Sequence, residues 1–213
     1  MAQGGQKPAY GYVPYGYVEP NGKEFADNTG ALFKEDVGEA KKLLEQGMKE
    51  EGITAMPPIP ILYNTLNLHK KIAEAVQEMW RKNLGLNVTL ENVEMKVRLE
   101  RNHKHDYAIT RDGWNGDYID PMTFLGQQIS TSTQNFSGFN NKQYDDLVKK
   151  ANEALNPEER LKYMHDAEKI LVEEMPLIPI YYYTQPYAVK SNVKGVFCTS
   201  NRYPDVMYAE ITK

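Results

Sequence analysis

The block Gly113–Pro121 contains the residues whose types and spacing could do chemistry, namely Trp114, Asp117 and Asp120. Two carboxylates could serve a hydrolase as its acid and its base, because one can protonate a leaving group while the other accepts a proton from the attacking water. A spacing of three residues on a turn gives no reason, however, for the two carboxylates to face each other. The chain also has no Gly-x-Ser-x-Gly elbow, phosphate-binding loop or His-Glu-x-x-His run. We therefore expect that the chain is not an enzyme.

His103 and His105 suggest a second kind of chemistry. On a strand, a His-x-His pair directs both rings to one face and could bind a transition metal with Asp106 nearby. No third ligand is convincing, and the chain has a single cysteine, Cys198, so thiolates cannot complete a site and no internal disulfide can form. A solvated polar loop is the favoured interpretation, and we expect no metal and no cofactor.

The elements before this block follow the order of an α/β crossover unit. Apolar residues at helical spacing predict a helix from Asp36 to Gly52 and a second one around residues 72–80 that ends near Gly85. Short strands are predicted at Ile59–Tyr63 and Leu86–Leu90 on either side of the second helix. This strand, helix, strand succession is typical of parallel strands joined by a helix, so the fold class is α/β.

The strand that leads into the chemical block fixes where its side chains lie. Tyr107–Arg111 is predicted as a strand that continues directly into Asp112 and Trp114, while Val93–Leu99 fits another strand or a strand–helix junction. Ligands of open α/β sheets collect at the carboxyl ends of the strands. Position alone therefore makes the Trp114 block a candidate binding site.

The second half of the chain predicts two helices and a return to a sheet. Residues 126–141 form a polar loop, and a helix follows from Tyr144 to Leu155. The next helix begins at Pro157 with Asn156 as its N-cap. Strands are expected at Leu177–Tyr183 and at Val193–Phe197, before a tail that contains a final extended piece at residues 208–211.

Composition excludes several classes of function. The 213 residues carry a formal net charge of -4 with a pI near 5.7, so no basic field attracts nucleic acid. No apolar run approaches the roughly 18 residues that a membrane span needs. The first residues lack a basic region followed by an apolar core, so we expect no secretory or lipoprotein signal in this chain. The chain has fifteen tyrosines and six phenylalanines. This surplus of tyrosine suits a partly solvated cleft, because a buried tyrosine hydroxyl needs a hydrogen-bond partner.

Four sequence blocks occur in an order and at separations that identify a family. They are Gly4–Ala9, the block Gly113–Pro121, Gly138–Asn141 with Tyr144-Asp145, and Pro176–Tyr183. Together they resemble the oligopeptide- and dipeptide-binding family of solute receptors for ABC importers. The resemblance implies one lobe of a two-lobed periplasmic-binding-protein (Venus-flytrap) fold, with a mixed sheet flanked by helices. Family members are longer, so the chain looks like a C-terminal excerpt.

The resemblance also implies a set of peptide-binding residues. Asp117 matches the residue that holds the peptide's ammonium group, and a turn aspartate that bonds its own backbone is the alternative. Trp114 and Asn115 match positions whose main chain pairs with the ligand, although Trp114 could instead be a core aromatic residue. Arg111 is placed to meet a peptide carboxylate, with an ion pair to Asp112 or Asp106 as its alternative. Tyr183 and His103 resemble further positions near the ligand, although Tyr183 could instead be a strand tyrosine that lies half in the core.

The implied function is the substrate-binding component of a peptide ABC importer. Its partners would be short peptides and the membrane permease, and its full-length form would be extracytoplasmic, either lipid-anchored or periplasmic. Residues 1–185 would form the peptide-binding lobe, and residues 186–213 would return toward a second lobe. A peptide-pheromone receptor and a metal-chelate (nickel-type) binding protein of the same family are the alternatives. We expect the lobe alone to fold but to bind peptides weakly.

Overall fold

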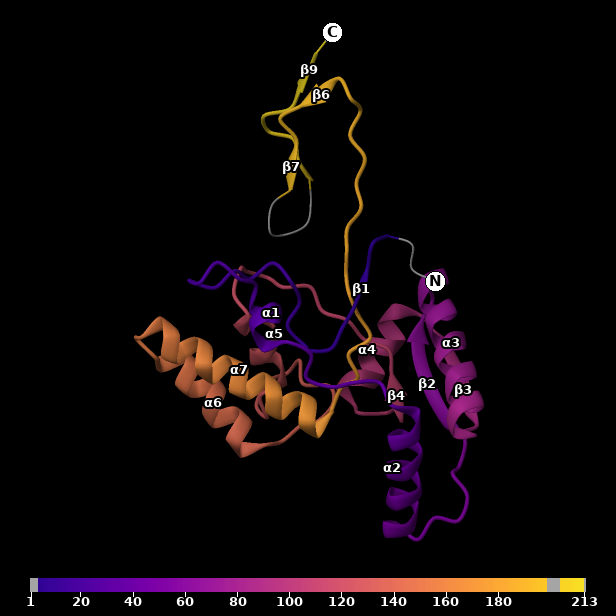
Figure 1. Ribbon diagram of the computed structural model, residues 1–213. Coiled ribbons are helices and arrows are strands. Elements are labelled where there is room, and N and C mark those ends of the chain that lie inside the picture. Colours follow the sequence, from indigo (N-terminus) through magenta and orange to yellow (C-terminus); the bar gives the residue numbers. More distant parts are fainter. Residues whose placement is uncertain (1–3, 199–203, 213) are drawn as a thin grey trace. The chain divides into compact units, whose positions relative to one another are not determined.

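The computed structural model describes residues 4–198 and 204–212, and these fall into two compact units. The first unit is Lys34–Gly113. The second unit combines the N-terminal residues up to Phe33 with the residues from Trp114 onward. Figure 1 shows both units and labels most of their elements. The boundary expected after residue 185, between the peptide-binding lobe and the C-terminal segment, is not the boundary between these two units and stays a prediction.

The first unit is built on a three-stranded parallel sheet. Its strand order is β3 (Val88–Val93), β2 (Ile59–Asn64), β4 (Ile109–Thr110), with Ile61 of the central strand opposite Leu90 on one side and Ile109 on the other. Helix α3 (Asn67–Leu84) connects β2 to β3, and Gly85 ends it in the left-handed conformation at φ 69°. The predicted crossover unit is confirmed, and with it the α/β class.

Two more helices complete this unit. Helix α2 (Val37–Glu50) begins where the Asp36 side chain accepts a hydrogen bond from the Glu39 amide at 2.9 Å. Helix α4 (Met95–His103) follows β3 directly, so the Val93–Leu99 segment is a strand–helix junction. A small core forms under α3, where the buried side chains of Ile61, Leu86 and Val88 pack with Trp80.

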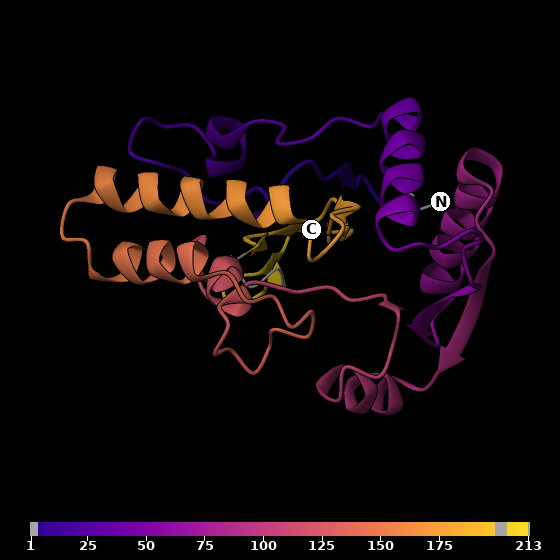
Figure 2. The same cartoon turned by 90° about the horizontal axis from the view of Figure 1, so that it is seen from below.

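Helices dominate the second unit. They are α1 (Phe25–Thr29), α5 (Met122–Leu125) with the short 3-10 turn η1 (Gly126–Gln128), α6 (Lys142–Glu153) and α7 (Pro157–Glu174). Helices α6 and α7 run side by side, as the two views show (Figures 1 and 2). Asn156 caps α7 by accepting from the amides of Glu158 at 2.8 Å and Glu159 at 3.2 Å, as the sequence predicted. The main core lies here and includes Val13, Phe25, Leu125, Tyr144, Met164, Ala167 and Leu171.

A buried carboxylate attaches the N-terminal loop to α7. The Oε1 atom of Glu168 accepts hydrogen bonds from the amides of Tyr12 at 2.7 Å and Val13 at 2.8 Å. Its Oε2 atom lies 3.1 Å from the hydroxyl of Thr29, which is 2.7 Å from Nδ1 of His165. Burial raises the pKa of Glu168, and the amide hydrogen bonds partly counter that effect.

The C-terminal strands are shorter than predicted. The expected strand at Leu177–Tyr183 is reduced to β5 (Tyr181–Tyr182), which pairs antiparallel with β1 (Lys7–Pro8). The expected strand at Val193–Phe197 is divided into β6 (Val193–Lys194) and β7 (Phe197–Cys198) by Gly195 at φ 75°. A Cβ atom on Gly195 would lie 2.0 Å from the carbonyl oxygen of Tyr208, so only glycine fits this turn.

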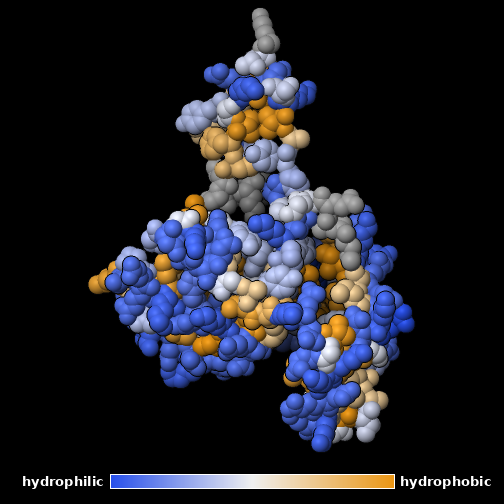
Figure 3. Space-filling model, viewed as in Figure 1, coloured by the Kyte–Doolittle hydropathy of each residue, from blue (hydrophilic) through white to orange (hydrophobic). Residues whose placement is uncertain are grey.

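Within residues 190–198 and 204–212, the strands pair in twos. Strand β6 pairs with β9 (Glu210–Ile211), and β7 pairs with β8 (Pro204–Asp205), both antiparallel. Parallel and antiparallel pairings thus occur in separate sheets. Apolar side chains gather on the surface of this segment (Figure 3), among them Val206, Met207, Tyr208 and Ile211. Across the described ranges, no helix has the length and apolar character of a membrane span.

Candidate functional site

The residues Trp114–Pro121, called the site loop from here on, begin the second unit's long C-terminal part and lead into α5. Hydrogen bonds hold this loop to the start of α5. The amide of Asp117 donates to the Thr123 hydroxyl at 2.9 Å, and the amide of Met122 donates to Oδ1 of Asp120 at 2.9 Å. Gly116 is held close to its surroundings, because a Cβ atom there would lie 2.5 Å from the Tyr17 hydroxyl. The sequence Trp-x-x-Asp is therefore displayed by a tightly packed turn.

Asp117 differs from the aspartates on either side of it. Asp112 accepts a hydrogen bond from the amide of Gly113 at 2.8 Å, and Asp120 accepts one from Met122. The Asp117 side chain is exposed, and its carboxylate has no hydrogen bond or ion pair within residues 4–198 and 204–212. The geometry therefore gives no support to a turn-forming role for this carboxylate. It is available to a cationic ligand.

Trp114 and Asn115 show two different environments at the start of the loop. The Trp114 ring packs against the core of the second unit, as the core interpretation predicted. Its Nε1 atom is nevertheless buried without an acceptor among the described residues. Asn115 is exposed. Tyr183, also in the second unit, follows β5 and contacts the Tyr181 ring at 5.4 Å between centroids.

Arg111 and His103 belong to the first unit. Arg111 follows β4 and extends the pairing of that strand, because its amide donates to the carbonyl of Leu62 at 2.7 Å. His103 is the exposed last residue of α4. His105 lies in the following turn with φ 51°, so the two histidines are not on the strand that the metal-binding alternative required. Over the described part of the chain, no group of three or more His, Cys, Asp or Glu side chains could hold a metal ion.

Arg98 is the ion-pair partner that the sequence did not identify. It is buried at 1% exposure, and its Nη1 atom lies 3.1 Å from Oδ1 of Asp112 and 2.9 Å from the carbonyl oxygen of Arg111. The sequence had suggested an ion pair between Asp112 and Arg111, whereas the structure pairs Asp112 with Arg98. Arg98 thus holds the backbone at the carboxyl end of β4 in place, while its own Nε atom is buried without a partner in the described ranges.

His69 is a second residue that sequence reasoning missed. It lies in the first turn of α3, and its Nδ1 atom is 3.0 Å from the side-chain oxygen of Asn64, the last residue of β2. Burial, followed by the charges of Arg111 and Arg98, lowers the pKa of His69 to about 4, against the opposing effect of the hydrogen bond at Asn64. Polar residues directly after a buried strand were the available signal, since the same argument singled out Trp114.

Acid is expected to destabilise the first unit through His69. The pKa of His69 is 6.5 in the unfolded chain and about 4 in the folded unit. The unfolding free energy that depends on the neutral ring is therefore complete above pH 6.5 and falls as the pH drops toward 4. The total loss is roughly 3 kcal/mol. Urea unfolding of the Trp114→Phe variant measures this loss, because the remaining tryptophan, Trp80, reports the unfolding of the first unit. In His69→Gln this part of the pH dependence should disappear, and an unchanged profile would contradict the assignment.

Comparisons with known proteins agree with one another. The family model for bacterial extracellular solute-binding proteins, family 5 (Middle), matches residues 1–137. The dipeptide-binding protein DppE of Bacillus subtilis is 37% identical over 99% of this chain, and OppA of the same organism, an oligopeptide-binding protein, is 40% identical over 92% of it. The matches cover 39% and 36% of those two proteins, so the chain spans less than half of their length.

Solved structures give the same result. OppA of Listeria monocytogenes bound to peptide has a TM-score of 0.80 and 31% identity, over 98% of this chain and 40% of that one. A peptide-binding protein of a peptide ABC transporter has a TM-score of 0.78 and 34% identity, over 83% of this chain and 80% of that one. The predicted resemblance is confirmed: the chain belongs to family 5 of the bacterial extracellular solute-binding proteins.

Proposed function

We propose that this chain binds short peptides as part of the substrate-binding component of a peptide ABC importer. The observation that carries the proposal is the exposed, unpaired carboxylate of Asp117 on an otherwise packed loop. All peptides share an α-ammonium group, and a carboxylate at a fixed position can hold it by charge-assisted hydrogen bonds. The names of DppE and OppA support peptides as the ligand class. The role is one of binding and release, without catalysis.

In this proposal Trp114 and Asn115 bind the peptide backbone. Main-chain pairing of the ligand with the site loop gives affinity that does not depend on the peptide's sequence. The unpaired Nε1 atom of Trp114 adds a donor that a ligand carbonyl could accept from. Tyr183 contributes a half-exposed ring beside β5. Side chains of the peptide are tolerated rather than recognised.

In the first unit, we propose an anion-binding position made by Arg111 and His69. Arg111 lies after the carboxyl end of β4, and its charge acts on the neutral His69 ring. The guanidinium group of an arginine matches a carboxylate with two parallel hydrogen bonds, so the carboxyl end of a short peptide is the proposed ligand. His103 stays a weaker candidate, because it is exposed at the end of α4.

The remaining partners are proposed from the family. We infer that residues 186–213 contact a second lobe, because Val206, Met207, Tyr208 and Ile211 expose apolar surface that a larger protein would cover. The full receptor is proposed to act outside the cytoplasm, where the family's description and the periplasmic relatives place such proteins, and to deliver peptides to a membrane permease. Short peptides, and not nucleic acids, are the proposed cargo.

A calorimetric titration tests the proposed function. Di- to penta-alanine peptides and their N-acetylated forms are titrated into this chain and into a receptor of full family length that carries it. We expect the free-amino peptides to bind the full-length receptor at least tenfold more tightly than the acetylated ones, and the isolated chain to bind all of them more weakly. Equal affinities of free and acetylated peptides would contradict the ammonium anchor.

A signalling receptor is the second candidate. The pheromone receptor PrgZ has a TM-score of 0.81 and 28% identity over 98% of this chain. An importer should accept many short peptides with similar affinity, whereas a receptor of this second kind should bind one peptide tightly and few others. The same titration, repeated with a random mixture of short peptides, separates the two functions.

A further inference from the structure

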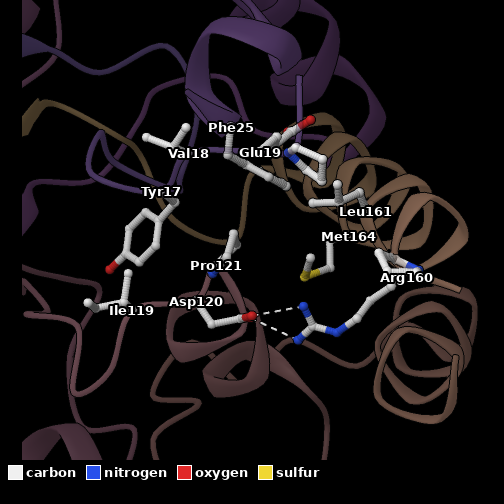
Figure 4. Close-up of a pocket in the computed structure, with 12 residues that line it drawn as sticks. Tyr17, Val18, Glu19, Phe25, Ile119, Asp120, Pro121, Arg160, Leu161 and Met164 are labelled. Carbon is white, nitrogen blue, oxygen red and sulfur yellow. Dashed lines mark hydrogen bonds and ion pairs between the residues drawn. The ribbon is translucent and has the colours of Figure 1, made fainter. Parts of the chain in front are cut away.

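A two-bond ion pair joins the site loop to α7. Nη1 of Arg160 lies 2.8 Å from Oδ2 of Asp120, and Nη2 lies 2.9 Å from Oδ1 (Figure 4). Both side chains are more than two-thirds buried. A guanidinium fork on a carboxylate fixes orientation as well as distance, because its two bonds are parallel. Such a pair restrains the loop more than a single contact would.

The helix that carries Arg160 is firmly placed. Arg160 lies in the first turns of α7, directly after the capped start at Asn156 and Pro157. Further along the same helix, Met164 and Ala167 are fully buried in the core. The two residues next to Asp120 on its N-terminal side, Tyr118 and Ile119, are exposed. The ion pair therefore attaches an exposed part of the loop to a rigid helix.

Asp120 also has an effect on the charge around Asp117. The two carboxylates are three residues apart in one loop, and both could attract an ammonium group. Arg160 occupies both oxygens of Asp120, and the hydrogen bonds to Asp120 raise the pKa of Arg160. Within the described ranges, Asp117 is thus the carboxylate of this loop that has no partner.

We propose that Arg160 is a positioning residue for ligand binding: it holds Asp120 on α7, fixes the site loop, and leaves Asp117 as the loop's available carboxylate. This inference rests on the peptide-binding function proposed above. Arg160 does not touch the ligand in this arrangement. Its pair with Asp120 forms one wall of a cavity of about 210 Å³ whose other walls include Phe25 and Leu161 (Figure 4).

The first test measures the order of the loop without any peptide. Arg160→Gln removes the charge and the fork, and we expect the amide of Asp117, bonded to Thr123, to exchange its hydrogen at least tenfold faster. Lys162→Gln is the matched control, because Lys162 forms an ion pair of 2.5 Å with Asp166 on the exposed face of the same helix. Unchanged exchange in Arg160→Gln would overturn the proposal.

The second test measures the preference for a free amino end, defined as the ratio of affinities for tri-alanine and N-acetyl-tri-alanine in the full-length receptor. We expect Arg160→Gln to reduce this ratio at least threefold, Arg160→Lys to restore part of it, and Lys162→Gln to leave it unchanged. Added to Asp117→Asn, Arg160→Gln should reduce the ratio no further, because it acts through Asp117. A merely structural role would weaken both peptides equally and keep the ratio.

The two failures are distinguishable. If the unmodified receptor shows no preference for the free amino end, the proposed function fails, and the exchange of the Asp117 amide still reports on Arg160. If that preference exists and is lost in Asp117→Asn but is retained in Arg160→Gln, the ammonium anchor stands and the positioning role of Arg160 is wrong.

Discussion

Asp117→Asn is expected to weaken the binding of peptides with a free amino end by roughly ten- to a hundredfold. A sheltered charge-assisted hydrogen bond contributes about 1.5 to 3 kcal/mol, and the amide of asparagine keeps the shape of the side chain without its charge. The loss should be specific to the ligand's ammonium group. Calorimetry with tri-alanine and N-acetyl-tri-alanine in a receptor of full family length measures it.

Two comparisons make this result decisive. N-acetyl-tri-alanine should bind the unmodified and the Asp117→Asn receptors with the same affinity, because the acetyl group has already removed the ion pair. Asp27→Asn removes the same charge from an exposed position in α1 of the same unit and should have no effect on either peptide. An equal loss in both variants would mean that general attraction by negative charge, and not Asp117, holds the ammonium group.

Glu168→Ala is expected to lower the unfolding free energy of the second unit by about 4 kcal/mol. The substitution leaves the amides of Tyr12 and Val13 without an acceptor in a buried place, at about 1 to 3 kcal/mol each, and adds a cavity. Urea unfolding of Trp80→Phe, in which Trp114 reports the second unit, measures the loss. The N-terminal loop should detach before the helices unfold.

Glu168→Gln is the matched control for shape and for charge. Its amide oxygen can still accept from both backbone amides, so the expected loss is below about 1.5 kcal/mol. Because burial raises the pKa of Glu168, the folded unit keeps this proton to a higher pH than the unfolded chain does. Stability therefore falls as the pH rises from about 4.5 through the folded pKa, and Glu168→Gln should lack that slope. Equal losses in the alanine and glutamine variants would contradict the role of the hydrogen bonds.

Much of the fold could be predicted because its signals are local. The cap at Asn156, the left-handed stop at Gly85 and the apolar spacing of the helices depend on residues within one or two turns of each other. The parallel sheet followed from the order of elements, since strands joined by a helix pair in parallel. The place of the site loop after β4 followed from the same order.

The rest depended on contacts between distant parts of the sequence. Glu168 and the amide of Tyr12 are 156 positions apart, and an acidic residue in a helix otherwise predicts an exposed face. The strand expected at Leu177–Tyr183 is short because its partner, β1, offers two residues for pairing. Arg160 and Asp120 are 40 positions apart, so nothing near Arg160 in the sequence indicates its partner. The roles of Asp117, Trp114, Asn115, Arg111, Tyr183 and His103 stay predictions.

The hydrogen-bonded row that runs from Glu19 through His165 and Thr29 to Glu168 has a limited supply of hydrogens. His165 Nε2 lies 2.8 Å from Glu19 Oε1, so this nitrogen must donate. The Thr29 hydroxyl has one hydrogen, so it can donate to only one of its two neighbours. If the hydroxyl donates to Glu168, its oxygen must accept from a protonated Nδ1 of His165, and the ring is a cation. If the hydroxyl donates to Nδ1, its oxygen must accept from Glu168, which is then the neutral acid. Both arrangements contain the same number of protons. A single proton shift through the Thr29 hydroxyl would therefore convert a charged His165 and Glu168 on α7 into a neutral pair, while Glu19 keeps its hydrogen bond to Nε2.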